Sequence, residues 1–75
     1  MPKIEVDIHG MTVSEAKYKL ERLIVSAAPN TEMTVIHGYR GGNALAEMVR
    51  KALKNKRIKQ KILSMNPGET TLLIS

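Results

Sequence analysis

The segments IEVDIHG at residues 4–10 and TVIHG at residues 34–38 each run from a strand-like pattern into the dipeptide His-Gly. In the first segment apolar and polar residues alternate strictly, which predicts a strand with one buried and one polar face. His9 and His37 are the only histidines of the chain, and each precedes a glycine, which lets the backbone turn sharply out of a strand. If the two strands are parallel neighbours, both histidines reach one edge of the sheet, where ligands bind in open α/β sheets.

Two helical patterns accompany these strands. Thr12 and Glu15 have the spacing of a capping box, and the apolar residues that follow predict an amphipathic helix ending near Ala28. A second helix is predicted to start near Asn43. Its buried face would carry the apolar residues that recur at helical spacing, which are Leu45, Met48, Val49, Ala52 and Leu53.

Two further strands complete the pattern. Residues 58–63 alternate between Ile58, Gln60 and Ile62 on one side and Lys59 and Lys61 on the other, which would place both lysines on the uncovered sheet face. The turn signal NPG at residues 66–68 precedes a closing strand over residues 70–74. The order β-α-β-α-β-β predicts an α/β fold, a two-layer α/β sandwich whose mixed four-stranded sheet carries two helices on one face.

Length and composition restrict the class of protein. With 75 residues the chain is expected to form one domain, residues 1–75, and the absence of cysteine excludes disulfide and thiolate chemistry. No apolar run reaches membrane-spanning length, and the start of the chain lacks the apolar segment of an export signal. We therefore expect a cytoplasmic protein with no membrane partner.

The net charge of +5 is unevenly distributed along the sequence. Seven of the twelve basic residues fall between Arg50 and Lys61, and no acidic residue interrupts that stretch. Such a cluster is typical of proteins that bind phosphate-bearing partners, above all nucleic acid. The alternative is a solvated helix end, where Lys and Arg complement the helix dipole.

A glycine-rich loop, HGYRGGN at residues 37–43, runs from the second strand into the second helix. Backbone N–H groups at such a position favour an anion such as phosphate, Arg40 adds a guanidinium suited to phosphate, and Tyr39 can stack on a base. The loop is neither a Walker A loop nor a dinucleotide-binding fingerprint. The alternative is a flexible crossover whose glycines only satisfy turn geometry.

Asp7 and His9 are two residues apart on one strand, so their side chains point to the same, uncovered face. A carboxylate beside an imidazole can fix its tautomer and raise its pKa, which suits general acid–base catalysis. The alternative is that both are ordinary polar residues of a solvated sheet face.

The motifs together resemble a known family. VDIHG at residues 6–10, followed by TVSEA at residues 12–16, is similar to the L-D-x-H-G opening of the small MutS-related (Smr) domain. The stretch from IHG at residues 36–38 to GGNAL at residues 41–45 resembles its H-G-x-G loop and following helix, and NPGET at residues 66–70 resembles the turn before its last strand. Arg40 stands where the second glycine of the strict loop motif would fall, and Val6 replaces the usual leucine.

The resemblance implies a fold similar to the C-terminal domain of a bacterial translation initiation factor. It also implies nucleic-acid binding and, in several members, endonuclease or nicking activity on DNA or RNA. Many such domains end a larger repair or pentatricopeptide protein, whereas we expect this chain to be a stand-alone, bacterial-type Smr protein.

The candidate site residues follow from the residues and the resemblance together. Candidate catalytic residues of a hydrolase acting on phosphodiester bonds are Asp7, His9 and His37, with His9 as base and His37 as acid or phosphate ligand. Candidate nucleic-acid or phosphate ligands are Gly38, Tyr39, Arg40, Gly41, Gly42, Arg50, Lys51, Lys54, Lys59 and Lys61. A divalent cation such as Mg²⁺, a zinc ion held by Asp7 and the two histidines, and a metal-free route all stay open. The metal-free route is easiest on RNA, whose 2′-hydroxyl is an internal nucleophile.

Three classes of function remain: a nuclease, a nucleic-acid-binding module without turnover, and an adaptor whose basic face meets an acidic protein. Lys59, Lys61 and Glu5 on the uncovered sheet face would oppose self-association, so we expect a monomer.

Overall fold

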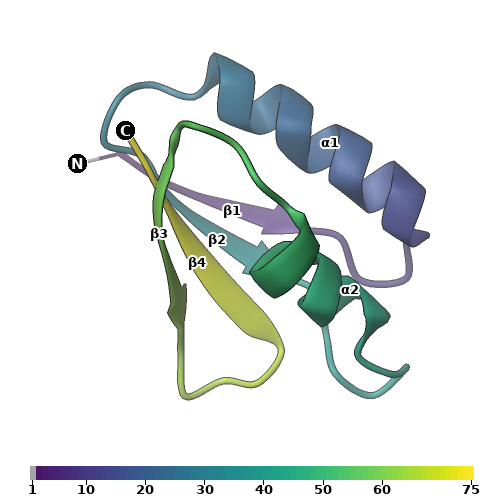
Figure 1. The fold of residues 1–75 in the computed structure, drawn as a ribbon. Coiled ribbons are helices and arrows are strands. Elements are labelled where there is room, and N and C mark those ends of the chain that lie inside the picture. Colours follow the sequence, from purple (N-terminus) through teal and green to yellow (C-terminus); the bar gives the residue numbers. More distant parts are fainter. Residues whose placement is uncertain (1) are drawn as a thin grey trace.

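The computed structural model describes residues 2–75 and has the predicted order of elements (Figure 1). Strand β1 (Lys3–Asp7) leads into helix α1 (Val13–Ser26), and β2 (Glu32–Ile36) leads into the short helix α2 (Ala44–Glu47). A π-helical turn, η1 (Met48–Ala52), continues α2 without a break, and the hairpin of β3 (Ile58–Leu63) and β4 (Glu69–Ile74) closes the chain. No helix in this part of the chain is long and apolar enough to cross a membrane.

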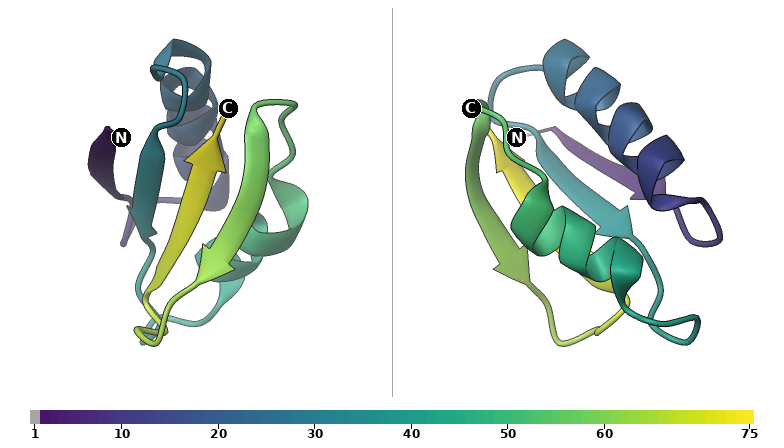
Figure 2. Two further views of the ribbon diagram at one scale, coloured as in Figure 1. Left: turned by 90° about the vertical axis from the view of Figure 1, so that its left-hand side faces the viewer. Right: turned by 45° about the vertical axis from the view of Figure 1, so that its right-hand side comes forward.

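The four strands form one mixed sheet in the order β1-β2-β4-β3. β1 and β2 are parallel, whereas β4 is antiparallel to both β2 and β3. Both helical segments lie on the same face of this sheet, and Figure 2 (left) looks onto the other, open face. The two-layer α/β fold expected from the sequence is thus confirmed.

The core fills the space between the sheet and the helices. Val6, Val35 and Leu72 point inward from the strands, and the buried side of α1 presents Leu20 and Ile24 to them. The capping box starts α1 as predicted, because Thr12 Oγ1 accepts from Glu15 N at 3.2 Å while the Glu15 carboxylate accepts from Thr12 N at 3.1 Å.

The prediction for the second helix is correct in position but wrong in one face residue. Met48, Val49 and Leu53 are buried, whereas Ala52 is exposed and Ala46 is buried instead. The π-helical turn explains the difference, since Leu53 N donates to Met48 O five residues earlier at 2.7 Å and the helical period is interrupted there.

Strand β3 departs from the predicted alternation. A register shift between Ile58 and Gln60 inserts one residue into the strand, so residues after it point to the opposite face. Lys61 is therefore paired with the buried Leu72 on the helix-covered face, and Ile62 lies on the open face with 39% of its surface exposed. The prediction that Lys61 lies on the open face is wrong for this reason.

The two ends of the described chain meet at the start of β2. Glu32 N donates to Pro2 O at 2.8 Å, and Ile74 N donates to Thr31 O at 2.9 Å. Figure 1 shows both ends of the described chain at the same end of the sheet, opposite the loops that follow β1 and β2.

Candidate functional site

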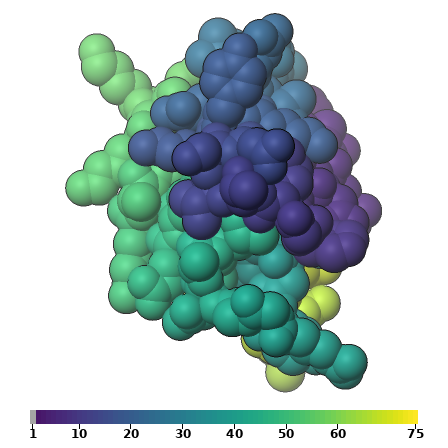
Figure 3. Space-filling view, turned by 90° about the vertical axis from the view of Figure 1, so that its right-hand side faces the viewer, coloured from purple at the N-terminus to yellow at the C-terminus, as the bar shows by residue number. Residues whose placement is uncertain are grey.

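The two His-Gly segments come together at the carboxyl ends of the parallel strands. Asp7 pairs with Ile36 in the sheet, and Ile8 N donates to Ile36 O at 2.9 Å. The two segments that follow β1 and β2 therefore leave the sheet side by side. Figure 3 looks onto this end, where the teal loop after β2 projects below the purple segment that leads into α1. A pocket of about 650 Å³ lies here, lined by residues 9–13, 36–42, 44 and 45.

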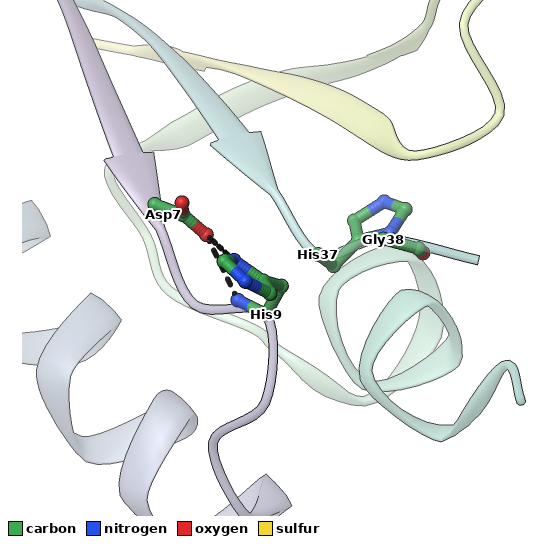
Figure 4. Close-up of polar contacts among 4 residues, drawn as sticks. All are labelled: Asp7, His9, His37 and Gly38. Carbon is green, nitrogen blue, oxygen red and sulfur yellow. Dashed lines mark hydrogen bonds and ion pairs between the residues drawn. The ribbon is translucent and has the colours of Figure 1, made fainter. Parts of the chain in front are cut away.

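The pair of Asp7 and His9 is formed as the sequence predicted. The His9 Nδ1 atom lies 2.5 Å from Asp7 Oδ1, and the same carboxylate oxygen accepts from His9 N at 3.0 Å (Figure 4). The hydrogen bond from the imidazole, reinforced by the backbone one, lowers the pKa of Asp7 below its ordinary value. The side chains are 69% exposed for His9 and 53% for Asp7, so the imidazole is oriented yet open to solvent.

His37 occupies a different environment. Its residue surface is only 4% exposed, and its ring points away from His9 (Figure 4). The Nδ1 atom lies 2.9 Å from Gly38 O, and Nε2 lies 2.9 Å from the hydroxyl oxygen of Thr70, so both ring nitrogens have partners within the protein. The structure therefore brings Asp7 and His9 together but does not turn the His37 ring into their site.

The loop after His37 has the backbone geometry that its glycines suggest. Gly38 and Gly42 have φ values of 75° and 101°, in the region that glycine adopts at little cost. Gly68 of the β3–β4 turn holds the start of the loop, since its carbonyl accepts from His37 N at 2.9 Å and from Gly38 N at 3.1 Å. A Cβ atom on Gly68 would lie 3.3 Å from the Tyr39 ring, so this glycine allows the two loops to touch.

Tyr39 and Arg40 form the outer rim of the pocket. Tyr39 is 56% exposed, and the Arg40 guanidinium carbon lies 6.0 Å from the centre of its ring. Gly41 and Gly42 are exposed beyond them. An aromatic ring and a guanidinium are thus presented to solvent beside the Asp7–His9 pair.

The basic stretch between Arg50 and Lys61 does not form one free surface. Arg50 donates to Thr70 and Glu69, and Arg57 donates to the carbonyls of Ile24, Val25 and Ser75. Lys61 donates to Arg50 O at 3.3 Å and to Leu53 O at 2.5 Å, and its pKa is lowered by desolvation and then by the nearby charge of Lys54. The basic residues of the stretch whose surfaces are exposed are Lys51, Lys54, Lys56 and Lys59.

Two residues that matter here were missed by sequence reasoning. Thr70 is fully buried and bonds His37, and Gly68 is buried beneath Tyr39. Both lie in the NPGET stretch at residues 66–70, and Thr70 also shares an even spacing with Leu72 and Ile74 on the buried face of a strand.

The zinc set of Asp7, His9 and His37 considered from the sequence is not assembled. Within residues 2–75 no group of three His, Cys, Asp or Glu side chains is placed to hold a metal ion. The buried His37 ring uses both nitrogens elsewhere, as described above.

A mixed sheet covered on one face, with a glycine-rich pocket at the carboxyl ends of its parallel strands, defines a small two-layer α/β domain with a candidate ligand site at that end of the sheet. The family model of the Smr domain matches residues 6–71, so the chain belongs to the Smr domain family. This is a nucleic-acid-binding type of domain. No curated protein matches the chain.

Proposed function

We propose that this Smr domain binds unpaired nucleic acid in the pocket between the two His-Gly loops and cleaves its phosphodiester backbone with His9 as the general base. The observation that carries the proposal is the pairing of His9 Nδ1 with Asp7 at the open mouth of that pocket. The proposal is consistent with family membership, which establishes only the binding class.

The geometry of the pair supports base catalysis. A proton on Nδ1 is donated to the carboxylate, which leaves the lone pair of Nε2 on the solvent side as the acceptor. On RNA, Nε2 would take the proton of a 2′-hydroxyl while the 2′-oxygen attacks the adjacent phosphorus. The bond from phosphorus to the 5′-oxygen then breaks, and that oxygen takes a proton from water. A cyclic 2′,3′-phosphate and a 5′-hydroxyl are the products.

The lining of the pocket favours an unpaired nucleotide over a duplex. Met11, Val13 and Leu45 give it an apolar floor, whereas Arg40 and the glycine loop offer charge and backbone N–H groups at its rim. A base can enter an apolar pocket of this kind only when it is unstacked from its neighbours. Tyr39 at the rim offers a surface on which the next base could stack.

The test is a cleavage assay on end-labelled single-stranded RNA, RNA hairpins and supercoiled DNA, each with Mg²⁺ and with chelator. His9→Ala and Asp7→Ala should lower the cleavage rate by about 100-fold or more, the scale of general acid–base catalysis. Glu5→Ala is the matched control, because Glu5 is an exposed carboxylate on the same strand and face as Asp7. It should cleave as the wild type does.

Two results would contradict the catalytic proposal. Equal cleavage of a strand with a single 2′-deoxy substitution at the cut position would exclude the internal nucleophile. Intact substrates with a gel shift in every variant would make the domain a binding module without turnover. The chelator lanes decide whether a divalent cation takes part.

A further inference from the structure

Three side chains from three separate segments form a buried hydrogen-bonded relay behind the glycine loop. Arg50 Nε donates to Thr70 Oγ1 at 2.8 Å, and Thr70 Oγ1 lies 2.9 Å from His37 Nε2. His37 Nδ1 lies 2.9 Å from the carbonyl oxygen of Gly38. The relay therefore runs from the π-helical turn, through β4, to the Gly38–Tyr39 peptide of the loop that lines the pocket.

The partners of the relay assign its protons. Gly38 O can only accept, so His37 Nδ1 carries a hydrogen. Thr70 is fully buried and its oxygen already accepts from the Arg50 guanidinium. Its hydroxyl hydrogen then finds an acceptor in His37 Nε2, which must be unprotonated. An added proton on His37 Nε2 would make the ring a cation and leave the Thr70 hydroxyl hydrogen without this acceptor. The positive charges of Arg50 and His37 would then both lie against one buried oxygen.

The far end of the relay is fixed by Lys61. Its ammonium group donates to Arg50 O and Leu53 O, which are carbonyls at the end of the helix. Arg50 itself also donates from Nη2 to Glu69 O at 3.3 Å. Lys61 thus fixes the backbone that carries Arg50, and two residues of β4 hold its guanidinium.

The near end of the relay lies close to His9. Gly38 has the positive φ described above, and a Cβ atom built on it would lie 3.6 Å from the Cβ atom of His9. Gly38, held by His37 at its carbonyl oxygen and by Gly68 at its N–H group, therefore lies next to His9 in the lining of the pocket. Rotation of the Gly38–Tyr39 peptide would move this part of the pocket lining and the loop that follows it.

We propose that His37 is a neutral positioning residue. The Arg50–Thr70–His37 relay then fixes the Gly38–Tyr39 peptide through its carbonyl oxygen, and with it the pocket beside His9. His37 is then neither the general acid nor a phosphate ligand of the site. The proposal rests on the proposed function only for its activity readout.

The first test needs no variant and no substrate. Long-range ¹H–¹⁵N NMR spectra of the wild-type protein distinguish the two neutral tautomers of each imidazole and the doubly protonated ring. We expect His37 to show the hydrogen on Nδ1 alone at neutral pH. A hydrogen on Nε2 in His37, alone or with Nδ1, would overturn the proposal whatever the protein binds.

The second test compares variants that keep or break single bonds of the relay. His37→Asn places an amide N–H near the position of Nδ1, so it should retain cleavage within a few-fold of wild type, whereas His37→Ala should lose about tenfold or more in affinity and rate. Likewise Thr70→Ser should preserve function, and Thr70→Val should lose about tenfold. Thr71→Val is the matched control, since Thr71 lies one residue along β4 on the open face and bonds only Thr34, at 3.3 Å.

These outcomes separate the relay from the proposed function. If His37 were the general acid, His37→Asn would lose as much cleavage as His37→Ala while keeping its affinity for a labelled oligouridylate. If wild-type protein neither binds nor cuts any strand, the proposed function fails, but the His37 tautomer and the ¹³C chemical shift of the Gly38 carbonyl in Thr70→Val still decide the positioning role. An unchanged Gly38 carbonyl shift in a folded Thr70→Val would contradict it.

Discussion

The two histidines stand in the same sequence context, but one is exposed and the other is buried. The difference follows from the positions of their strands in the sheet. His9 follows β1, an edge strand, and stays exposed beside Asp7. His37 follows β2, which has a neighbour on each side, and the start of β4 buries its ring against Thr70. A polar residue at the end of a central strand must find its partners inside the protein, whereas one at the end of an edge strand can remain available to a ligand.

At the same scale, Glu15 predicts how stability responds to acid. Hydrogen bonds from the backbone and then the hydroxyl of Thr12 lower the pKa of Glu15 below 4.5 in the folded protein. A carboxyl group whose folded pKa is lowered stabilises the fold above its unfolded pKa, and this contribution is lost as the pH falls through the folded value. Glu15→Gln should therefore lose less stability than wild type between about pH 7 and about pH 3, measured by urea unfolding.

The control for this prediction is Glu21→Gln, because the Glu21 side chain makes no hydrogen bond within residues 2–75. The decrease in its free energy of unfolding between about pH 7 and about pH 3 should match that of wild type. An equal loss in Glu15→Gln and wild type would show that the capping carboxylate does not contribute to the acid sensitivity.

At the scale of elements, Arg57 connects three parts of the chain. Helix α1 has no basic residue in its last turn, and Arg57 Nη1 supplies the missing donor to Ile24 O at 2.7 Å and Val25 O at 3.1 Å. Arg57 Nε and Nη2 donate to Ser75 O at 3.0 and 2.9 Å. One side chain before β3 thus closes the end of α1 and holds the end of β4.

We expect Arg57→Gln to lower the free energy of unfolding by about 2 kcal/mol, the scale of hydrogen bonds to a charged group. Lys56→Gln should change it by less than about 0.5 kcal/mol, because the exposed Lys56 side chain makes no hydrogen bond in the described part of the chain. Denaturant unfolding of both variants measures the difference. Equal stability of the two would mean that Arg57 has no structural role and is an ordinary surface charge.

At the scale of the whole molecule, charge is segregated between faces. Four of the seven acidic residues lie on the open sheet face by strand register, and they are Glu5, Asp7, Glu32 and Glu69. Lys3 on that face is paired with Glu32 at 3.6 Å. Despite its net charge of +5, the molecule thus offers a polyanion an unfavourable sheet face, and the pocket with Arg40 is the better approach.

This arrangement predicts different effects of two single-charge changes on oligonucleotide binding. Arg40→Gln should weaken affinity for a labelled oligouridylate and reduce the slope of log K against log salt by about one. Glu5→Gln should leave both unchanged. A clear gain of affinity in Glu5→Gln, with Arg40→Gln neutral, would instead place the nucleic acid across the open sheet face.

The elements and their order could be predicted from the sequence because hydrophobic periodicity, the capping box and the glycine turns are local signals. The Asp7–His9 pair could be predicted for the same reason, since the two residues are only two positions apart, at and just after the end of β1. The faces of Lys61 and Ile62 could not, because a single inserted residue in β3 reverses the alternation after it. The relay of Arg50, Thr70 and His37 could not be predicted from local sequence patterns either, because it joins segments that meet only in the folded protein.

The meeting of both chain ends at Thr31 and Glu32 has a consequence for how the domain can be joined to other polypeptides. Pro2 and Ile74 both bond the start of β2, at the end of the sheet opposite the loops that follow β1 and β2 (Figure 1). The domain can therefore be carried at either end of a longer chain, or be inserted into a surface loop of a host protein, with the pocket between the two His-Gly loops still facing outward. Affinity tags at either end should likewise leave the pocket unobstructed in binding and cleavage assays.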